Sequence, residues 1–146
     1  LRSDGDQPIR HAFEIRHDSF GSPAFVEMLR RHNVALVCAD TVEWPLLMDI
    51  TADFIYCRLH GSEQLYVSGY EDEALDLWAE RIRAWATGGE PKNATRVLAP
   101  RAAADRGRDV YLYFDNTDKK LRAPVDADHL SQRLADLMPR SAPKAA

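Results

Sequence analysis

The sequence has few of the residues that mark redox and metal centres. Only two cysteines occur in 146 residues, Cys38 and Cys57, and no CxxC pair or Cys/His cluster accompanies them. Each lies in an apolar, strand-like run, where a thiol behaves as a small buried hydrophobe. We therefore expect both cysteines to pack in the core.

Long apolar runs and an excess of basic charge are also missing. No run approaches the roughly 20 residues that span a bilayer, and the amino terminus shows no charged-then-apolar signal segment. The formal net charge is −4, and lysine and arginine are scattered along the chain. A basic stripe is typical of proteins that bind nucleic acid. The sequence therefore predicts neither a membrane nor a nucleic-acid partner, and a cytoplasmic location is the default.

Glycine-rich phosphate-binding turns are absent as well. No strand-like run is followed by GxGxxG or GxxxxGK[ST], and neither Ser62 nor Ser68 lies in a GxSxG elbow. These absences disfavour the common nucleotide-binding folds and a Ser-His-Asp hydrolase. What is present is a mixture of 45% hydrophobic and 29% charged residues, which is typical of one folded domain.

Strand-like runs and helical patterns alternate along the chain. One helix is predicted to begin at Pro23 with Ser22 as its cap, one to open at the acidic residues 71–73, and one to have Asp126 as its cap. The pattern of residues 43–48 predicts a loop with one helical turn. Residues 97–104 are predicted to form a short helical piece within a long loop. The predicted strands cover residues 11–16, 34–39, 54–60 and 109–115.

A strand followed by a helix, repeated about four times, indicates parallel pairing through right-handed crossovers. A doubly wound sheet and half of a barrel both fit this pattern, and the missing phosphate-binding turn favours the barrel. We predict an α/β fold that is the C-terminal half of a TIM-like (β/α)8 barrel, with four parallel strands alternating with helices. This partial barrel covers residues 11–138, with a disordered or loop remnant at 1–10 and a flexible tail at 139–146.

Polar side chains gather near the carboxyl ends of these strands. Successive strand residues point to opposite sides, and in each strand one row is apolar enough to lie under a helix. The other row gains charge toward the end of the strand, where a barrel opens into its mouth. We therefore expect six side chains to converge there: Glu14, Arg16, Asp40, Arg58, His60 and Asp115.

Two functions are compatible with such a charged layer. In the first, a polar or anionic small molecule binds at the strand ends, with Glu14, His60 and Asp115 as the candidate catalytic residues. Carboxylates with one histidine also fit a divalent metal, although their spacing is not diagnostic. In the second, the layer is a noncatalytic ion-pair network that holds the barrel shut, because buried charges need partners. The candidate ligand-binding residues are Arg16, His17, Asp40, Arg58, Tyr66, Tyr70 and Asn116.

Three linked segments resemble a known family. They are residues 14–17 (Glu-Ile-Arg-His), residues 56–61 (Tyr-Cys-Arg-Leu-His-Gly) with Tyr66 and residues 69–70 downstream, and residues 111–116 (Tyr-Leu-Tyr-Phe-Asp-Asn). Together they resemble the YecE-like family, domain of unknown function 72, from about His11 to Leu137. The resemblance implies a TIM-barrel-like fold in proteins roughly twice as long, whose biochemical activity is not established.

The resemblance also implies that a large part of the family's barrel is absent from this sequence. The matching segments correspond to the C-terminal half alone, and the first residue, Leu1, is not methionine. We interpret the chain as a processed product, a truncated chain or an incomplete reading frame. An open four-stranded remnant would expose two strand edges and an apolar interior. The expected partner is therefore the missing N-terminal half or a second copy of the chain.

Overall fold

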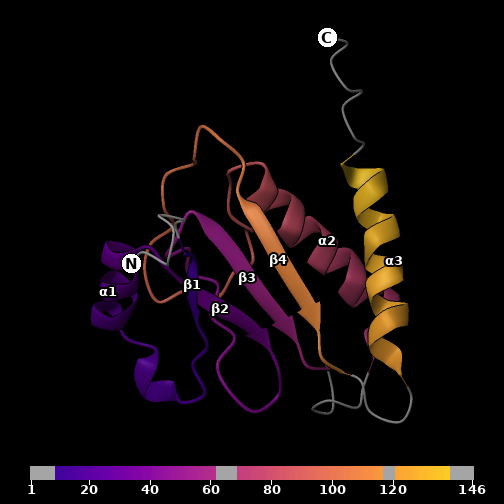
Figure 1. The fold of residues 1–146 in the computed structure, drawn as a ribbon, viewed down its shortest axis with the longest axis horizontal. Helices are drawn as coiled ribbons and strands as arrows, with labels where there is room; N and C mark the ends of the chain where they lie inside the picture. The colour runs from indigo at the N-terminus through magenta and orange to yellow at the C-terminus, as the bar shows by residue number, and fades with distance from the viewer. Residues whose placement is uncertain (1–8, 62–68, 117–120, 139–146) are drawn as a thin grey trace.

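The fold is built on a parallel sheet of four strands. The computed structural model describes residues 9–61, 69–116 and 121–138. The strands lie in the order β1-β2-β3-β4, and the fold is α/β as predicted (Figure 1). All neighbouring pairs are parallel. Their bounds are β1 (His11–Phe13), β2 (Val34–Asp40), β3 (Phe54–Leu59) and β4 (Asp109–Phe114).

Three α-helices pack on one face of this sheet, and their bounds follow from their caps and end signals. They are α1 (Pro23–His32), α2 (Asp72–Ala86) and α3 (Arg122–Leu137), and a short 3-10 turn, η2 (Asp18–Phe20), precedes α1. The Ser22 hydroxyl accepts a hydrogen bond from the Phe25 amide at 3.4 Å, which confirms the predicted cap of α1. Helix α2 ends two residues before the Gly88-Gly89 pair, in agreement with the sequence pattern.

The core lies between the sheet and these helices. The inward side of α2 carries Leu75, Trp78 and Trp85, each almost completely buried, and they pack against the aliphatic row of β3 and β4. Cys38 and Cys57 are paired across β2 and β3, buried and not disulfide-bonded, so both pack in the core as predicted. Burial raises the pKa of the Cys57 thiol well above its usual range, and the Cys38 sulfur beside it raises it further.

The opposite face of the sheet carries no described helix. Strand β4 shows this most clearly, because its residues alternate between exposed and half-buried. Tyr111 and Tyr113 are 40% and 51% exposed, whereas Leu112 and Phe114 pack toward α2 and α3. The rings of Tyr111 and Tyr113 are therefore uncovered within the described part of the chain, whereas Phe54 on the same face is buried.

Two predicted helical pieces are wrong, and neighbouring hydrogen bonds explain why. Residues 97–104 form no helix, because the amides of Val97 and Leu98 donate to the Asp49 carboxylate at 2.8 and 2.9 Å. Residues 43–48 form no helical turn either. Pro45 disfavours helical geometry at the residue before it, and the Met48 amide donates to the Thr95 carbonyl at 2.8 Å.

The predicted cap of the last helix is also wrong. Helix α3 begins at Arg122, so Asp126 lies inside the helix and is 1% exposed. Pro124 is tolerated near this start because the first-turn amides of a helix have no intrahelical acceptor. The Asp126 carboxylate serves a tertiary contact instead, as described below.

Among the described residues, no helix is both long and apolar enough to cross a membrane. The predicted remnant at 1–10 and the tail at 139–146 fall almost entirely outside the described residues.

Candidate functional site

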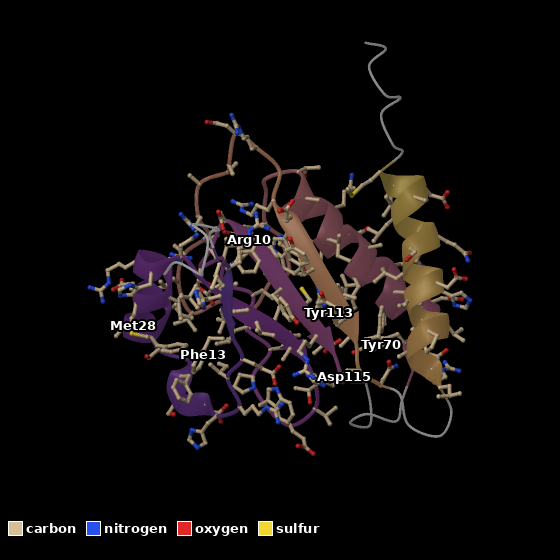
Figure 2. The ribbon with its side chains drawn as sticks, in the orientation of Figure 1. Arg10, Phe13, Met28, Tyr70, Tyr113 and Asp115 are labelled. Carbon is tan, nitrogen blue, oxygen red and sulfur yellow. The ribbon has the colours of Figure 1, made fainter. Side chains whose placement is uncertain are left out.

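An ion-paired cluster lies at the carboxyl end of the sheet, where β1, β3 and β4 end. Glu14 follows β1, Arg58 is the penultimate residue of β3, and Asp115 follows β4. The Arg58 guanidinium bridges the two carboxylates: Nη1 lies 2.6 Å from Glu14 Oε2, and Nη2 donates to Asp115 Oδ2. Figure 2 shows Asp115 at this end of the sheet. One arginine therefore ties three strands together.

Two further side chains extend the cluster at its ends. Arg16 places Nε at 2.9 Å and Nη2 at 2.8 Å from Glu14 Oε1. His60 Nδ1 lies 2.9 Å from the second oxygen of Asp115. We call these five residues, Glu14, Arg16, Arg58, His60 and Asp115, the charged cluster. The structure thus brings together five of the six side chains that were expected to converge.

The cluster keeps Glu14 and Arg58 ionised. Burial raises the pKa of Glu14, but the hydrogen bonds from Arg58 and Arg16 outweigh it and hold that pKa below its ordinary value. Burial lowers the pKa of Arg58, yet the Glu14 and Asp115 carboxylates raise it overall. An ionised Glu14 is suited to accept hydrogen bonds and orient Arg58, and it is poorly suited to donate a proton near neutral pH.

Trp44 packs against both ends of the charged cluster. Its ring meets the His60 ring edge-to-face at 5.6 Å between centroids, and the Arg16 guanidinium lies 4.8 Å above it. Sequence reasoning did not single out Trp44. The available signal was its position in the loop directly after β2, because loops at the carboxyl edge of a parallel sheet carry functional residues.

Access to the charged cluster differs from residue to residue. The His60 side chain is fully buried, and Glu14 is largely buried. The side chains of Arg58 and Asp115 are 29% and 26% exposed, and that of Arg16 is 57% exposed. Arg16, Arg58 and Asp115 are therefore the members that a ligand can contact directly.

Stacked tyrosines adjoin the cluster on the uncovered face of the sheet. The rings of Tyr56 and Tyr113 stack at 5.3 Å between centroids, and Tyr113 is the β4 partner of Arg58 in the strand register. Figure 2 shows Tyr113 on β4, with Asp115 beyond it at the carboxyl end of the strand. The tyrosine faces are suited to stacking on a ring, and the neighbouring arginines and carboxylate are suited to hydrogen bonding with polar groups.

Asp40 and His17 lie outside the charged cluster. The Asp40 carboxylate accepts a hydrogen bond from Trp78 Nε1 of α2 at 3.0 Å, so it faces the helices, and its expected convergence with the other charges is wrong. The strand alternation explains this, because Asp40 shares the row of the buried Cys38. His17 is exposed, and its Nδ1 accepts from the Ser19 amide at 3.2 Å, which caps η2.

Tyr70 and Asn116 belong to a separate buried anchor. The Asp126 carboxylate accepts from the Tyr70 amide at 3.2 Å and from Asn116 Nδ2 at 2.8 Å. The Tyr70 hydroxyl accepts from the Gly61 amide at 3.2 Å. Burial raises the pKa of Tyr70, and the nearby Asp40 carboxylate raises it further. Tyr66, also predicted to bind ligand, lies outside the described residues.

This anchor positions the segments that follow β3 and β4. Tyr70 and Asn116 are 3% and 0% exposed, so within the described structure they support the carboxyl end rather than face a ligand. Sequence reasoning missed Asp126 because a carboxylate near a helix start reads as a cap.

The described residues contain no group of three or more histidine, cysteine, aspartate or glutamate side chains placed to hold a metal ion. Within the charged cluster, both carboxylates are directed at Arg58.

Comparison with known proteins identifies the family. The family model described as protein of unknown function DUF72 matches residues 1–146. The chain belongs to the DUF72 family. The resemblance to the YecE-like family, domain of unknown function 72, is thereby confirmed. None of the curated proteins matches the sequence.

Solved structures of DUF72 proteins share the fold. A DUF72 protein from Thermotoga maritima has a TM-score of 0.64 and 21% identity, with 92% of this chain and 48% of that chain covered. A DUF72 protein from Enterococcus faecalis V583 has a TM-score of 0.62 and 17% identity, with 94% and 52% covered. A second structure of that protein gives 0.59 and 15%, with 91% and 50% covered. The DUF72 chain described here thus spans about half the length of these relatives.

Proposed function

We propose that the carboxyl end of the sheet binds a polar, anionic small molecule. The observation that carries this proposal is the exposure of two arginines and one carboxylate of the charged cluster beside stacked tyrosines, on a face that no described helix covers. Arginine presents a planar fork that matches carboxylate and phosphate groups. Binding sites of parallel α/β folds occur at this end of the strands.

We propose a different part for each residue on the basis of its contacts. Arg16 is the most exposed cation and is held at one edge by Glu14, so its remaining guanidinium donors are available to an anionic group. Arg58 is fixed between Glu14 and Asp115, which limits the entropy lost when it contacts a ligand. His60 is a positioning residue, because its side chain is buried and its Nδ1 meets Asp115. Tyr113 supplies a face for a sugar or base ring.

A noncatalytic, structural role is the second candidate. It is favoured by the pairing within the charged cluster, because Arg58 contacts two carboxylates and each carboxylate contacts a second basic group. In that case the cluster joins three strands and has no ligand.

Ligand screening of wild-type and variant chains separates the two candidates. We expect at least one compound from a panel of sugar phosphates and nucleotides to raise the melting temperature of the wild-type chain and to give a titration by calorimetry. Arg16→Ala should weaken that response. Arg31→Ala is the matched control, since Arg31 is an exposed arginine at the far end of α1. No response from the wild type, or the same response from Arg16→Ala, would favour the structural candidate.

We further propose that the sheet is one half of a (β/α)8 barrel whose second half covers the tyrosine face. The length of the solved relatives supports this, since they are about twice as long as the matched chain. So does the arrangement of the sheet, because helices pack on one face alone and the outer strands β1 and β4 have unpaired edges within the described residues. Four further strand-helix units would cover the exposed rings and pair both edges.

Sedimentation of the 146-residue chain tests the barrel proposal. We expect the isolated chain to self-associate as its concentration rises, because the exposed rings and strand edges lack their cover. Addition of a polypeptide corresponding to the first half of a DUF72 barrel should convert these species to a one-to-one complex. A stable monomer with a cooperative unfolding transition at all concentrations would contradict the proposal.

A further inference from the structure

A cavity lies at the amino-terminal edge of the sheet, away from the charged cluster. Its volume is about 570 Å³. Four of its lining residues each come directly before a strand: Arg10 before β1, Asn33 before β2, Asp53 before β3 and Arg108 before β4. Figure 2 shows Arg10 and Asp115 at opposite ends of the sheet. The parallel sheet therefore assembles this cavity from four strand starts.

The lining of the cavity has an excess of positive charge. Arg101 and Arg106 complete a set of four lining arginines, against the single carboxylate of Asp53. Asp53 Oδ1 also accepts a hydrogen bond from Asn33 Nδ2 at 3.2 Å. We call this cavity the arginine pocket. Such a concentration of guanidinium groups is notable in a chain whose formal net charge is −4.

The four arginines differ in how far they are already paired. Arg10 Nη1 lies 2.6 Å from Asp109 Oδ2 and donates to the Tyr111 hydroxyl at 3.0 Å. Arg108 Nη1 donates to the Gly89 carbonyl at 3.0 Å. Arg101 and Arg106 are exposed, and neither side chain forms an ion pair with any described residue. Two guanidinium groups are therefore available at the pocket.

The backbone that carries these arginines is fixed against the end of α2. The Ala104 amide donates to the Gly88 carbonyl at 2.9 Å, and Gly88 has a positive φ of 90°. Gly107 passes so close to α2 that an added Cβ would lie 2.0 Å from the Ala86 carbonyl oxygen. The hydrogen bond from Ala104 and the close approach at Gly107 place the segment against the end of α2, and glycine alone fits both positions.

We propose that the arginine pocket binds a phosphate-bearing small molecule with at least two negative charges. Arginine binds phosphate through paired N–H donors. Three of the four lining arginines form no ion pair with a described residue, and against the single Asp53 carboxylate they exceed what one monoanion neutralises. The volume falls in the range of pockets that bind small metabolites, about 300–1,000 Å³. The inference stands apart from the function proposed for the carboxyl end.

The environment of Arg108 agrees with a missing counter-charge. Burial lowers the pKa of Arg108, and the neighbouring Arg101 lowers it further against an opposing effect of Glu90. The negative charge of a bound dianion would favour the protonated guanidinium and so oppose the lowering by burial and by Arg101.

Calorimetric titration of the full chain with pyrophosphate at low salt tests the inference. We expect saturable binding to the wild type, weaker binding of inorganic phosphate, and an affinity that falls as salt rises. The double variant Arg101→Gln, Arg106→Gln should bind pyrophosphate at least roughly tenfold more weakly. Neither side chain forms an ion pair within the described part of the chain, so the variant should fold normally, which a thermal melt checks.

Two control variants identify where the anion binds. Arg83→Gln removes an exposed charge of α2 and Arg31→Ala removes one of α1, and neither residue lines the pocket. Both should retain wild-type affinity for pyrophosphate. The inference is overturned if the wild type does not bind pyrophosphate, if inorganic phosphate binds as tightly, if the double variant binds normally, or if either control loses affinity to the same extent.

Discussion

The two ends of the sheet use arginine in opposite ways. At the carboxyl end, two arginines face two carboxylates and a histidine, and Arg58 joins residues from three strands. At the amino end, four arginines line one cavity with a single carboxylate, and two of them have no ion pair among the described residues. Charges that satisfy one another contribute to stability, whereas charges left uncompensated are available to a ligand.

The largest effect should come from the buried anchor at the carboxyl end. Asp126→Ala leaves the Tyr70 amide and Asn116 Nδ2 without their carboxylate acceptor in a buried site. We predict a loss of about 3 kcal/mol in the free energy of unfolding, measured by urea denaturation. Asp126→Asn is the matched control, since it keeps one acceptor oxygen and should lose less. Equal stability of Asp126→Ala and wild type would show that the anchor is not needed.

A smaller loss should follow from removing the bridge between the strands. Arg58→Ala leaves Glu14 and Asp115 facing each other without the cation between them. Because Arg58 is partly exposed, we predict about 2 kcal/mol rather than the larger values of fully buried pairs. Urea denaturation measures it, and high salt should reduce the difference. If Arg58→Ala kept full stability and lost only ligand binding, the structural candidate would fail.

The acid sensitivity of the fold should depend on Glu14. The pKa of this carboxyl is lowered in the folded chain, so its contribution is present above its unfolded pKa and is lost as pH falls through its folded pKa. Between about pH 5 and pH 3, wild-type stability should therefore decline more steeply than that of Glu14→Gln. At pH 7 the variant should be less stable by about 1 kcal/mol. Parallel pH profiles of the two chains would rule this out.

The smallest effect on stability should come from the amino end. The double variant Arg101→Gln, Arg106→Gln removes two charges that form no ion pair with described residues, so stability should stay within about 0.5 kcal/mol of wild type. At low salt, relief of repulsion toward Arg108 favours a slight gain. A loss comparable to that of Arg58→Ala would mean that the two ends do not differ in the way described.

Periodicity made most of the fold predictable. Alternation along residues 109–114 separated the row under the helices from the tyrosine row, and the structure follows that division. The same alternation predicted that Glu14, Arg58 and Asp115 lie at one edge of the sheet, because parallel strands end at the same edge. The cap of α1 was also readable, since Ser22 acts on an amide three residues away.

Long-range hydrogen bonds account for the predictions that were wrong. The Val97 and Leu98 amides donate to the Asp49 carboxylate and so are not available for helical hydrogen bonds. Asp49 lies about fifty residues away in the sequence, so a local sequence pattern does not predict this contact. Asp40 was predicted to join the charged strand ends and Asp126 to cap a helix, yet Asp40 accepts a hydrogen bond from Trp78 of α2 and Asp126 accepts one from the Tyr70 amide. The arginine pocket was missed for the same reason, since its arginines are scattered along the sequence.

The sequence by itself determined which residues form strands and helices, and which strand rows carry charge, because these depend on side-chain spacing along a local backbone. Only the tertiary structure decided which charges meet. Arg58 is paired because three strand ends converge on it, and Arg106 has no ion pair among residues 9–61, 69–116 and 121–138 because its loop, packed on Gly88 near the end of α2, places it beside other arginines. Electrostatic energy depends on distance in space, which residue order does not fix.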